Sequence, residues 1–324
     1  MSGFGERLRV WVRFTRPFTL LPPLVGMLSG AATAVGALAH REGRGLGEVV
    51  RELGGESLWW HVALGALLAA SLNAGSNILN QWTDLENDRI NKPHRPLPAG
   101  HVGLRETFAL VVFFYLLSFG LAAAIRPEGR WHTFWVVVGG AVMTVLYSVP
   151  PFRTKRFGTL ANLTIATARG CLLKVCGWSC VAAIFPDPEP WYIGGVFALF
   201  LVGAASTKDY ADMEGDRAAG CITWPIRFGP RRAARLMAPF FVLPWLLIPL
   251  GLVLPAPGRE ALLTGDARLL VGVSLLLAAY GVLVARLILR DPDALATTEN
   301  HPSWRHMYLQ MMLAQLGLML AYLI

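Results

Sequence analysis

The chain has 324 residues, of which 54% are hydrophobic and only 15% are charged, and its mean hydropathy is +0.48. A soluble domain is about 25% charged, so this composition excludes an ordinary soluble protein and predicts an all-α membrane protein. The net charge of +8 does not indicate a nucleic-acid partner, because the basic residues are spread over short segments between apolar stretches.

Apolar stretches recur along the whole chain, and a membrane span needs about 20 such residues. The first of them directly follows a run of arginines and is too long for a cleavable signal peptide. We therefore expect a single membrane domain over residues 1–324. Its nine transmembrane helices are predicted at residues 17–39, 59–83, 103–126, 132–149, 159–184, 190–211, 231–254, 267–289 and 304–324.

The basic residues also predict how these helices are oriented. With nine spans and the N-terminus inside, 20 of the 29 lysines and arginines fall in inside segments and 7 in outside segments. Cytoplasmic loops carry such an excess of positive charge. We expect the N-terminus in the cytoplasm and the C-terminus outside, in the inner membrane of a cell.

The second apolar stretch ends in a stripe of polar residues. Asn80, Asp84 and Asp88 follow at intervals of four, which a continuous helix places on one face over two turns, with Asn77 one turn earlier. Carboxylates crowded in this way repel one another unless a cation lies between them. Oxygen ligands of this kind suit Mg²⁺. We predict that Asn80, Asp84 and Asp88 bind the metal and act in catalysis.

The fifth apolar stretch contains two basic residues, Arg169 and Lys174. Ionisable groups at membrane depth are functional candidates. Lys174 is expected to pair with a neighbour or to extend toward the surface. Arg169 lies too deep to do so, and Asn162, seven residues earlier, lies on nearly the same helical face. We expect that face to line a cavity and Arg169 to bind substrate.

A second acidic motif ends the sixth apolar stretch. Asp212 and Asp216 repeat the spacing of four, and Lys208 and Asp209 precede them. Gly215 predicts a helix break that would free Asp216 to approach a metal. We predict that Asp212 and Asp216 bind the metal and that Asp209 joins them in catalysis.

The two motifs suggest an internal repeat. Asp84 and Asp212 are 128 residues apart, which corresponds to four spans, and a basic loop follows each motif. Because four is an even number, both copies keep the same orientation, as in a parallel repeat about an axis near the membrane normal. We expect two four-helix halves and a ninth helix, with both motifs facing one central cavity on the cytoplasmic side.

Two carboxylate sets around one cavity match the needs of a diphosphate, whose oxygens Mg²⁺ would bridge. Negative charge grows on those oxygens when a carbon–oxygen bond to diphosphate breaks, and basic side chains must meet it. The candidates for this role are Arg95, Arg153, Lys155, Lys208 and Arg217.

At these residues the sequence resembles the UbiA superfamily of intramembrane prenyltransferases. The first motif matches at Asn80, Asp84 and Asp88 and is followed by the loop Asn91–Gly100, while the second matches over Lys208–Asp216. A Tyr-Ser-x-Pro-Pro-x-x-x-Lys element, which is typical of the family, runs from Tyr147 to Lys155. The resemblance covers about residues 12–324 and adds Tyr147 to the expected substrate-binding residues. Asn77 is also expected to bind substrate, because it lies one turn before Asn80 on nearly the same face.

The resemblance implies nine transmembrane helices around a cavity that the two motif-bearing loops cap. It implies Mg²⁺-dependent transfer of a prenyl group, of geranylgeranyl type, from a prenyl diphosphate to an aromatic or lipid acceptor. Diphosphate would leave, and the acceptor would attack an allylic cation. The alternatives are a non-catalytic carrier of polyprenyl phosphates and a CDP-alcohol phosphotransferase, although the Asp-Gly-x-x-Ala-Arg string of the latter does not occur in the sequence.

Overall fold

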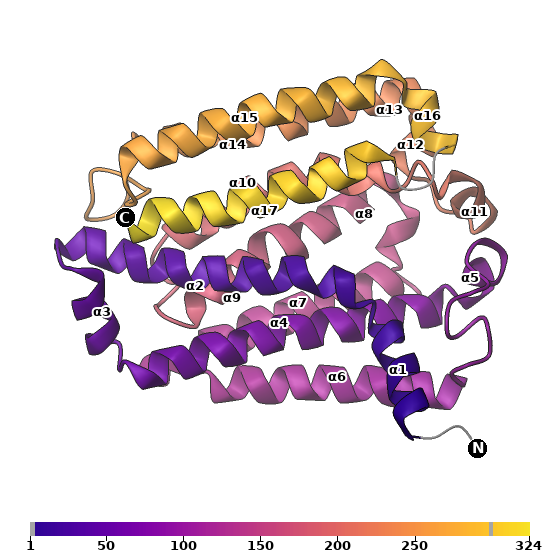
Figure 1. Ribbon diagram of the computed structural model, residues 1–324, viewed down its shortest axis with the longest axis horizontal. Helices are drawn as coiled ribbons and strands as arrows, with labels where there is room; N and C mark the ends of the chain where they lie inside the picture. The colour runs from indigo at the N-terminus through magenta and orange to yellow at the C-terminus, as the bar shows by residue number, and fades with distance from the viewer. Residues whose placement is uncertain (1–3, 298–300) are drawn as a thin grey trace.

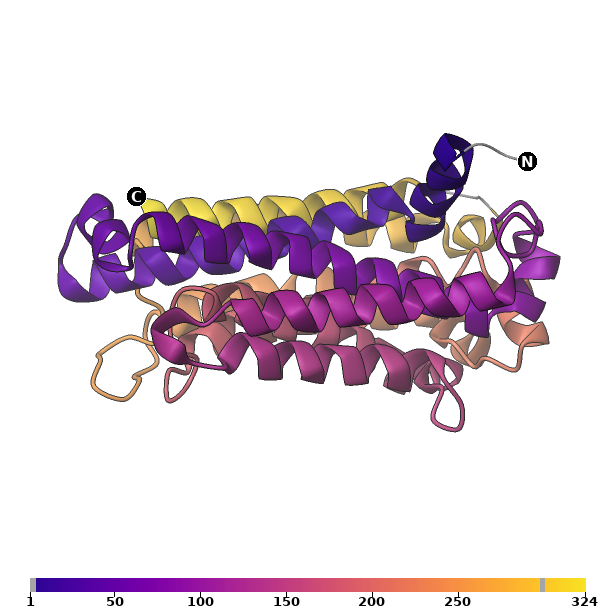
Figure 2. The ribbon, with the colours of Figure 1, turned by 90° about the horizontal axis from the view of Figure 1, so that it is seen from below.

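The computed structural model describes residues 4–297 and 301–324, in which helices are accompanied by two isolated β-bridges. Long helices lie side by side in an elongated bundle (Figures 1 and 2), and short helices gather with loops at one end of it. We call this the motif end, because it carries α5 (Leu85–Asn91) and α11 (Met213–Ala218), next to the two acidic motifs. The other end is called the opposite end.

Seven uninterrupted helices form most of the bundle. They are α2 (Leu21–Glu42), α4 (Glu56–Thr83), α6 (Leu104–Ala124), α7 (His132–Ser148), α10 (Glu189–Ala204), α15 (Ala267–Arg290) and α17 (Pro302–Leu323). Two further rods consist of consecutive helical segments. One joins α8 (Gly158–Ile165), the π-helix η4 (Ala166–Leu172) and α9 (Leu173–Ser179), and the other joins α13 (Pro230–Met237), the 3-10 helix η6 (Ala238–Phe241) and α14 (Leu243–Gly251).

Short helices lie between and beside these rods. Besides α5 and α11, the short α-helices are α1 (Phe4–Thr15), α3 (Leu46–Glu52), α12 (Trp224–Phe228) and α16 (Pro292–Thr297). The 3-10 helices are η1 (Pro17–Leu20), η2 (Pro127–Gly129), η3 (Thr154–Arg156) and η5 (Ala205–Thr207). In Figure 2, α1 projects away from the bundle at its motif end.

Six helical stretches of the described residues are long and apolar enough to cross a membrane, which makes the chain an all-helical membrane protein. They are Pro17–Glu42, Glu56–Thr83, Leu104–Ala124, Glu189–Thr207, Pro230–Gly251 and Ala267–Arg290. The three other predicted spans are also helical, as α7, as the α8–η4–α9 rod and as α17. Each predicted stretch is therefore a helix within the described part of the chain, whereas a membrane crossing by these last three stays a prediction.

Glycines allow α2 and α9 to approach closely. A side chain added at Gly30 would lie 2.5 Å from the carbonyl oxygen of Lys174, and one added at Gly177 would lie 2.3 Å from that of Met27. Both contacts are with backbone, so neither could be relieved by moving a side chain. Small residues at helix crossings favour tight packing in membranes. This crossing places Lys174 against α2 in the interior of the bundle.

Candidate active site

A cavity of about 600 Å³ lies between the long helices and reaches the motif end. This volume is typical of sites for small molecules. Charged and polar side chains line it near the motifs, including Asn80, Lys92 and Asp212. Its deeper walls are apolar and include Met27, Leu173 and Met311. The cavity can therefore hold a molecule with a charged head and an apolar body.

The first acidic motif does not stay on one continuous helix, contrary to the prediction. The helix α4 ends at Thr83, Asp84 has φ −103° and ψ 12°, and Asp88 lies on the short helix α5. The amide of Asp88 still donates to the carbonyl of Asp84 at 2.7 Å. The interruption turns α5 across the motif end while keeping one turn between the two carboxylates.

The second motif repeats this interruption. Asp212 lies between two helical segments with φ −98° and ψ 4°, and Asp216 lies on α11. The expectation that Gly215 breaks the helix is wrong, because Gly215 lies inside α11 and the break precedes it at Asp212. The amide of Asp216 donates to the carbonyl of Asp212 at 2.8 Å, as at the first motif.

Three motif aspartates, Asp84, Asp88 and Asp212, form ion pairs with residues from another segment or loop, whereas Asp209 pairs with its neighbour Lys208. Asp84 accepts hydrogen bonds from Lys155 and, at 3.0 Å, from Arg153. Arg95 donates to Asp88 at 2.5 Å. These contacts unite the first motif with the loops that follow it and with η3.

At the second motif, Lys92 donates to Asp212 at 2.9 Å and so joins the loop after the first motif to the second one. Lys208 lies 3.9 Å from Asp209. A β-bridge between Phe157 and Ile222 connects the loop before α8 to the loop after α11. The two motifs and their loops therefore form one connected cap over the cavity.

Burial changes the proton affinity of several cap residues. It raises the pKa of Asp88, an effect that Arg95 partly offsets, and it lowers the pKa of Lys155, which Asp84 partly offsets. Burial, with the nearby charge of Asp209, raises the pKa of Asp216 to about 7. A cation beside Asp216 would favour its ionised form.

The oxygens of the motifs are suitable ligands for Mg²⁺, which takes carboxylate and amide oxygens. The ammonium of Lys155 lies between Asn80 Oδ1, at 3.1 Å, and the carboxylate of Asp84. These two oxygens therefore converge on a point that stabilises positive charge. Within residues 4–297 and 301–324, no three acidic, histidine or cysteine side chains gather into a ready-made metal site. Metal binding would thus need Lys155, or the other lysines and arginines that pair with the motif carboxylates, to move aside.

The structure brings most predicted substrate-binding residues to the cavity. Its lining includes Asn77, Arg95, Tyr147, Arg169 and Lys208. The amide nitrogen of Asn77 is already used, since it donates to the carbonyl of Thr15 and the hydroxyl of Thr19.

Other predicted residues lie behind the lining or outside it. Arg153 and Lys155 do not line the cavity, but both donate to Asp84, and Lys155 also donates to Asn80 on the cavity wall. Arg217 is exposed on α11 and does not line the cavity. The side chain of Asn91, in the loop motif, lies outside the part of the chain that the structure describes.

Arg169 lies on the π-helix η4 and its side chain is exposed to the cavity, as predicted. Asn162 does not share that lining. Its amide is buried and donates to Ser206 Oγ at 2.8 Å. The π-helix has more residues per turn than an α-helix, so a spacing of seven no longer returns to the same face. Such π segments occur often at functional sites.

Arg16 is the last of the arginines that precede the first apolar stretch, and it is a cavity residue that the sequence did not predict. Arg16 joins α1 to η1 with φ 59°, a left-handed conformation that is uncommon for a side-chain-bearing residue. It lines the cavity, and it makes no hydrogen bond or ion pair through its side chain with any described residue. Arg169 is likewise unpartnered. Only the folded turn reveals that Arg16 and Arg169 supply positive charge to one cavity.

Known proteins are similar to this chain in sequence and in fold. Residues 46–306 match the UbiA prenyltransferase family. The chain is 28% identical over 243 residues to the bacteriochlorophyll synthase 34 kDa chain of Chloroflexus aurantiacus, covering 73% of each. It is 28% identical over 240 residues to homogentisate phytyltransferase 1 of Arabidopsis thaliana, covering 71% of this chain and 57% of the plant protein. The chain thus spans somewhat more than half the length of this plant relative.

The fold matches that of a UbiA homolog from Archaeoglobus fulgidus, with a TM-score of 0.67 and 21% sequence identity, over 97% of this chain and 99% of the other. The structure of that homolog bound to DMAPP and Mg²⁺ gives a TM-score of 0.63 at 20% identity, over 95% and 98% of the two chains. At this identity the likeness concerns the fold alone.

Proposed function

The chain belongs to the UbiA prenyltransferase family and is a multi-pass membrane prenyltransferase, and we propose that it transfers a geranylgeranyl-type group from its diphosphate to an aromatic or lipid acceptor. The observation that carries this proposal is the cavity, whose charged mouth lies under two acidic motifs and whose depth is apolar. Such a division suits a donor with a diphosphate head and a hydrocarbon tail.

The motif oxygens would hold Mg²⁺, which is bound together with a prenyl diphosphate in structures of the Archaeoglobus homolog. The ligands would come from Asn80, Asp84 and Asp88 in the first motif and from Asp212 and Asp216 in the second, with Asp209 beside them. When bound, the metal would neutralise charge on the leaving diphosphate. Binding would free the cations that now pair with these carboxylates.

The basic side chains of the cap would then face the leaving group. Lys92 and Arg95 lie in the loop over the cavity mouth, and Lys208 lines the same mouth. The bond between the donor's first carbon and its oxygen breaks, and both electrons leave with the diphosphate. Fixed positive charges near these oxygens lower the energy of this charge separation.

The apolar walls would protect the allylic cation that remains. Side chains such as Met27, Leu68 and Leu173 exclude water, which would otherwise capture the cation as an alcohol. The acceptor's nucleophilic atom forms the new bond to carbon and loses its proton. The prenyl tail would extend through the apolar part of the cavity toward lipid.

We place the motif end in the cytoplasm of a cell with the active site facing inward, at the inner membrane. The excess of lysine and arginine in the segments on that side supports this orientation. A soluble donor diphosphate would then reach the cavity mouth directly from the cytoplasm.

The test uses membranes that contain the full chain, with radiolabelled geranylgeranyl diphosphate and four acceptors: homogentisate, 4-hydroxybenzoate, chlorophyllide and a glyceryl lipid phosphate. We expect a Mg²⁺-dependent product whose mass equals that of one acceptor plus the prenyl group, less one proton. The matched Asp84→Ala and Asp212→Ala variants should insert normally and form none. Full activity in both variants would overturn the proposed roles of the motifs.

A further inference from the structure

The amide of Gln315 is a polar group on the cavity wall far along α17 from the motif end, and its surroundings fix which way it points. Gln315 lies on α17, lines the cavity and is only 4% exposed. Lys174 Nζ donates to its Oε1 at 2.8 Å. Because the lysine nitrogen is the donor in this hydrogen bond, the oxygen of the amide faces Lys174, and the nitrogen faces away from it.

Lys174 is itself held in place from three sides. Its ammonium donates to Ser29 Oγ at 2.6 Å and lies 5.1 Å from the ring of Phe197. Ser29 in turn donates to the backbone carbonyl of Gln315 at 2.6 Å. Lys174 is 2% exposed, and none of its contacts is with a carboxylate. This network joins α2, α9 and α17 and leaves the Gln315 amide no freedom to turn over.

The nitrogen of Gln315 has no hydrogen-bond partner among the described residues, yet it is not sealed in protein. Gly26 of α2 and Leu173 lie beside it, and Gln315 lines the cavity on its open side. The neighbouring cavity walls are apolar and include Met27, Leu173 and Met311. An unpaired donor in such surroundings costs free energy unless a ligand atom accepts from it.

A prenyl chain cannot be that ligand, because it is a pure hydrocarbon. Gln315 lies 11 residues beyond Trp304, which lines the cavity nearer the motif end, a distance of about 16 Å along the helix. We propose that Gln315, positioned by Lys174, is a specificity-determining residue that donates to a carbonyl or carboxylate oxygen of the acceptor at the deep end of the cavity. This proposal rests on the proposed prenyl transfer and adds where the acceptor lies.

The arrangement assigns different parts of the cavity to the two substrates. The diphosphate belongs at the charged mouth, and the acceptor's oxygen belongs at Gln315, so the reacting carbon lies between them. The prenyl tail must then leave the cavity sideways, because the acceptor occupies its deep end.

The test measures KM for both substrates in the wild type and in Gln315→Met, using geranylgeranyl diphosphate and the panel acceptor that the wild type prenylates. Methionine keeps the length of the side chain and removes the donor. We expect the KM of the acceptor to rise roughly five- to tenfold, while the KM of the donor stays the same. Lys174→Met should raise the same KM, and the double variant should add little to either change.

Gln310→Met is the matched control on the same helix. Gln310 is fully buried, and its amide donates to the carbonyls of Phe241 and Leu277 rather than toward the cavity. We expect this variant to lose stability with no change in the KM of the acceptor. A merely structural role for Gln315 would make the two variants behave alike and would overturn the proposal.

A second measurement compares two ligands within each protein, so that a difference in the folded fraction between proteins cancels. The wild type is compared on the same acceptor and on an analogue in which a methyl group replaces the carbonyl or carboxyl group remote from the prenylated atom. The wild type should bind the analogue more weakly, and Gln315→Met should not distinguish the two. A change only in the preferred length of the donor's tail would show that Gln315 contacts the tail, and would overturn the proposal. The wild type forms product throughout, so such a failure leaves the proposed prenyl transfer intact.

Discussion

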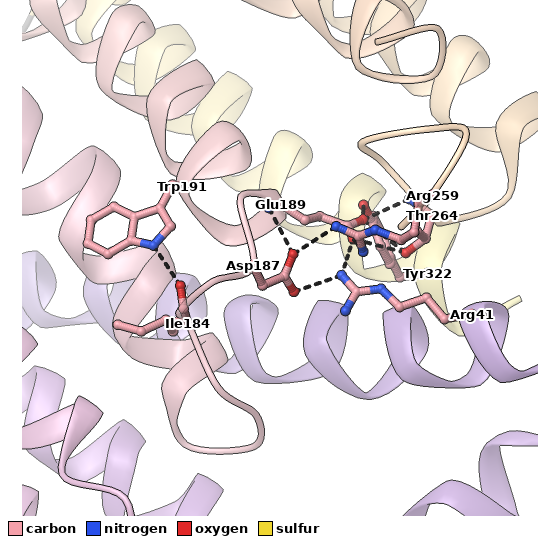
Figure 3. A network of polar contacts seen from close by, with 8 residues as sticks. All are labelled: Arg41, Ile184, Asp187, Glu189, Trp191, Arg259, Thr264 and Tyr322. Atoms are coloured by element: carbon pink, nitrogen blue, oxygen red, sulfur yellow. Dashed lines mark hydrogen bonds and ion pairs between the residues drawn. The ribbon is translucent and has the colours of Figure 1, made fainter. Parts of the chain in front are cut away.

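The two ends of the bundle each carry a cluster of charged residues, and the clusters differ in how completely their charges are paired. At the opposite end, Arg41 and Arg259 each bind both Asp187 and Glu189 (Figure 3). Glu189 also accepts from Thr264 and Tyr322. Every charge in that cluster has an opposite partner within reach, and Glu189 is wholly buried.

At the motif end, positive charge exceeds what the carboxylates pair. Arg16 and Arg169 line the cavity without an acidic partner among the described residues. In contrast, Asp84, Asp88 and Asp212 each pair with a lysine or an arginine. A closed set of ion pairs joins helices, whereas unpaired arginines around a cavity are available for an anionic ligand. The comparison teaches that incomplete pairing beside a cavity, rather than charge alone, marks the functional end.

The largest effect is expected from neutralising a motif aspartate. Asp84→Asn or Asp212→Asn keeps the size of the side chain but removes a charge that the proposed metal site requires. We expect prenyl transfer to fall by at least about 100-fold with unchanged insertion. Asp212→Asn, whose ion pair with Lys92 is partly exposed, should also keep its thermal stability. Initial rates of product formation by purified protein in lipid nanodiscs measure it. A loss of less than tenfold in both variants would contradict the claim that the motif end, and not the opposite end, carries the activity.

Glu189→Gln tests the opposite end. It leaves Arg41 and Arg259 with a single carboxylate, and breaking a buried ion pair costs about 3 kcal/mol of stability. We expect the thermal unfolding midpoint to fall by several degrees, while the turnover of the folded fraction stays at the wild-type value. The midpoint and the turnover are measured on the same detergent-solubilised sample. Unchanged stability, or lost turnover in fully folded protein, would contradict this assignment.

The unpaired arginines should act on binding without supporting the fold. Arg16→Met and Arg169→Met each remove one positive charge from the cavity, and a hydrogen bond to a charged group contributes about 2 kcal/mol. We expect the KM of a substrate to rise about 30-fold in each variant, and the stability to stay the same or increase. Steady-state kinetics with each substrate varied in turn measures the first effect. A lower unfolding midpoint would show a structural role instead.

The smallest effect is expected at an exposed pair on the motif end. Arg231 and Asp293 lie 3.1 Å apart, and their side chains are 77% and 57% exposed. Exposed ion pairs contribute less than about 1 kcal/mol, so Arg231→Ala should change neither turnover nor the unfolding midpoint measurably. A large loss of turnover here would mean that charge at the motif end matters without regard to the cavity.

Much of this arrangement could be predicted from the sequence because it depends on local patterns. Hydropathy located the helices, and the spacing of Asp84 and Asp212 placed both motifs beside one cavity. The π-helix around Arg169 could not be predicted, since no residue type specifies it, and its wider turn moved Asn162 off the lining. The left-handed turn at Arg16 was equally hidden.

The pairings between distant segments also needed the folded chain. Lys92 reaches Asp212 across 120 residues, and Lys174 reaches Gln315 across 141. Neither motif reveals which loop cation it will bind, because many lysines and arginines lie on the same side. Such contacts follow from how the helices pack, as where Gly30 meets Gly177.

The most direct test of the central claim is the rate of diphosphate release as Mg²⁺ is added back to chelator-treated protein with geranylgeranyl diphosphate and the acceptor. The wild type and Glu189→Gln should both be inactive in the chelator and recover over the same range of Mg²⁺ concentration. Asp212→Asn should need at least about tenfold more Mg²⁺ or fail to recover. Release in the presence of the chelator, or one Mg²⁺ dependence shared by all three proteins, would contradict the claim that the motif end is the metal-dependent active site.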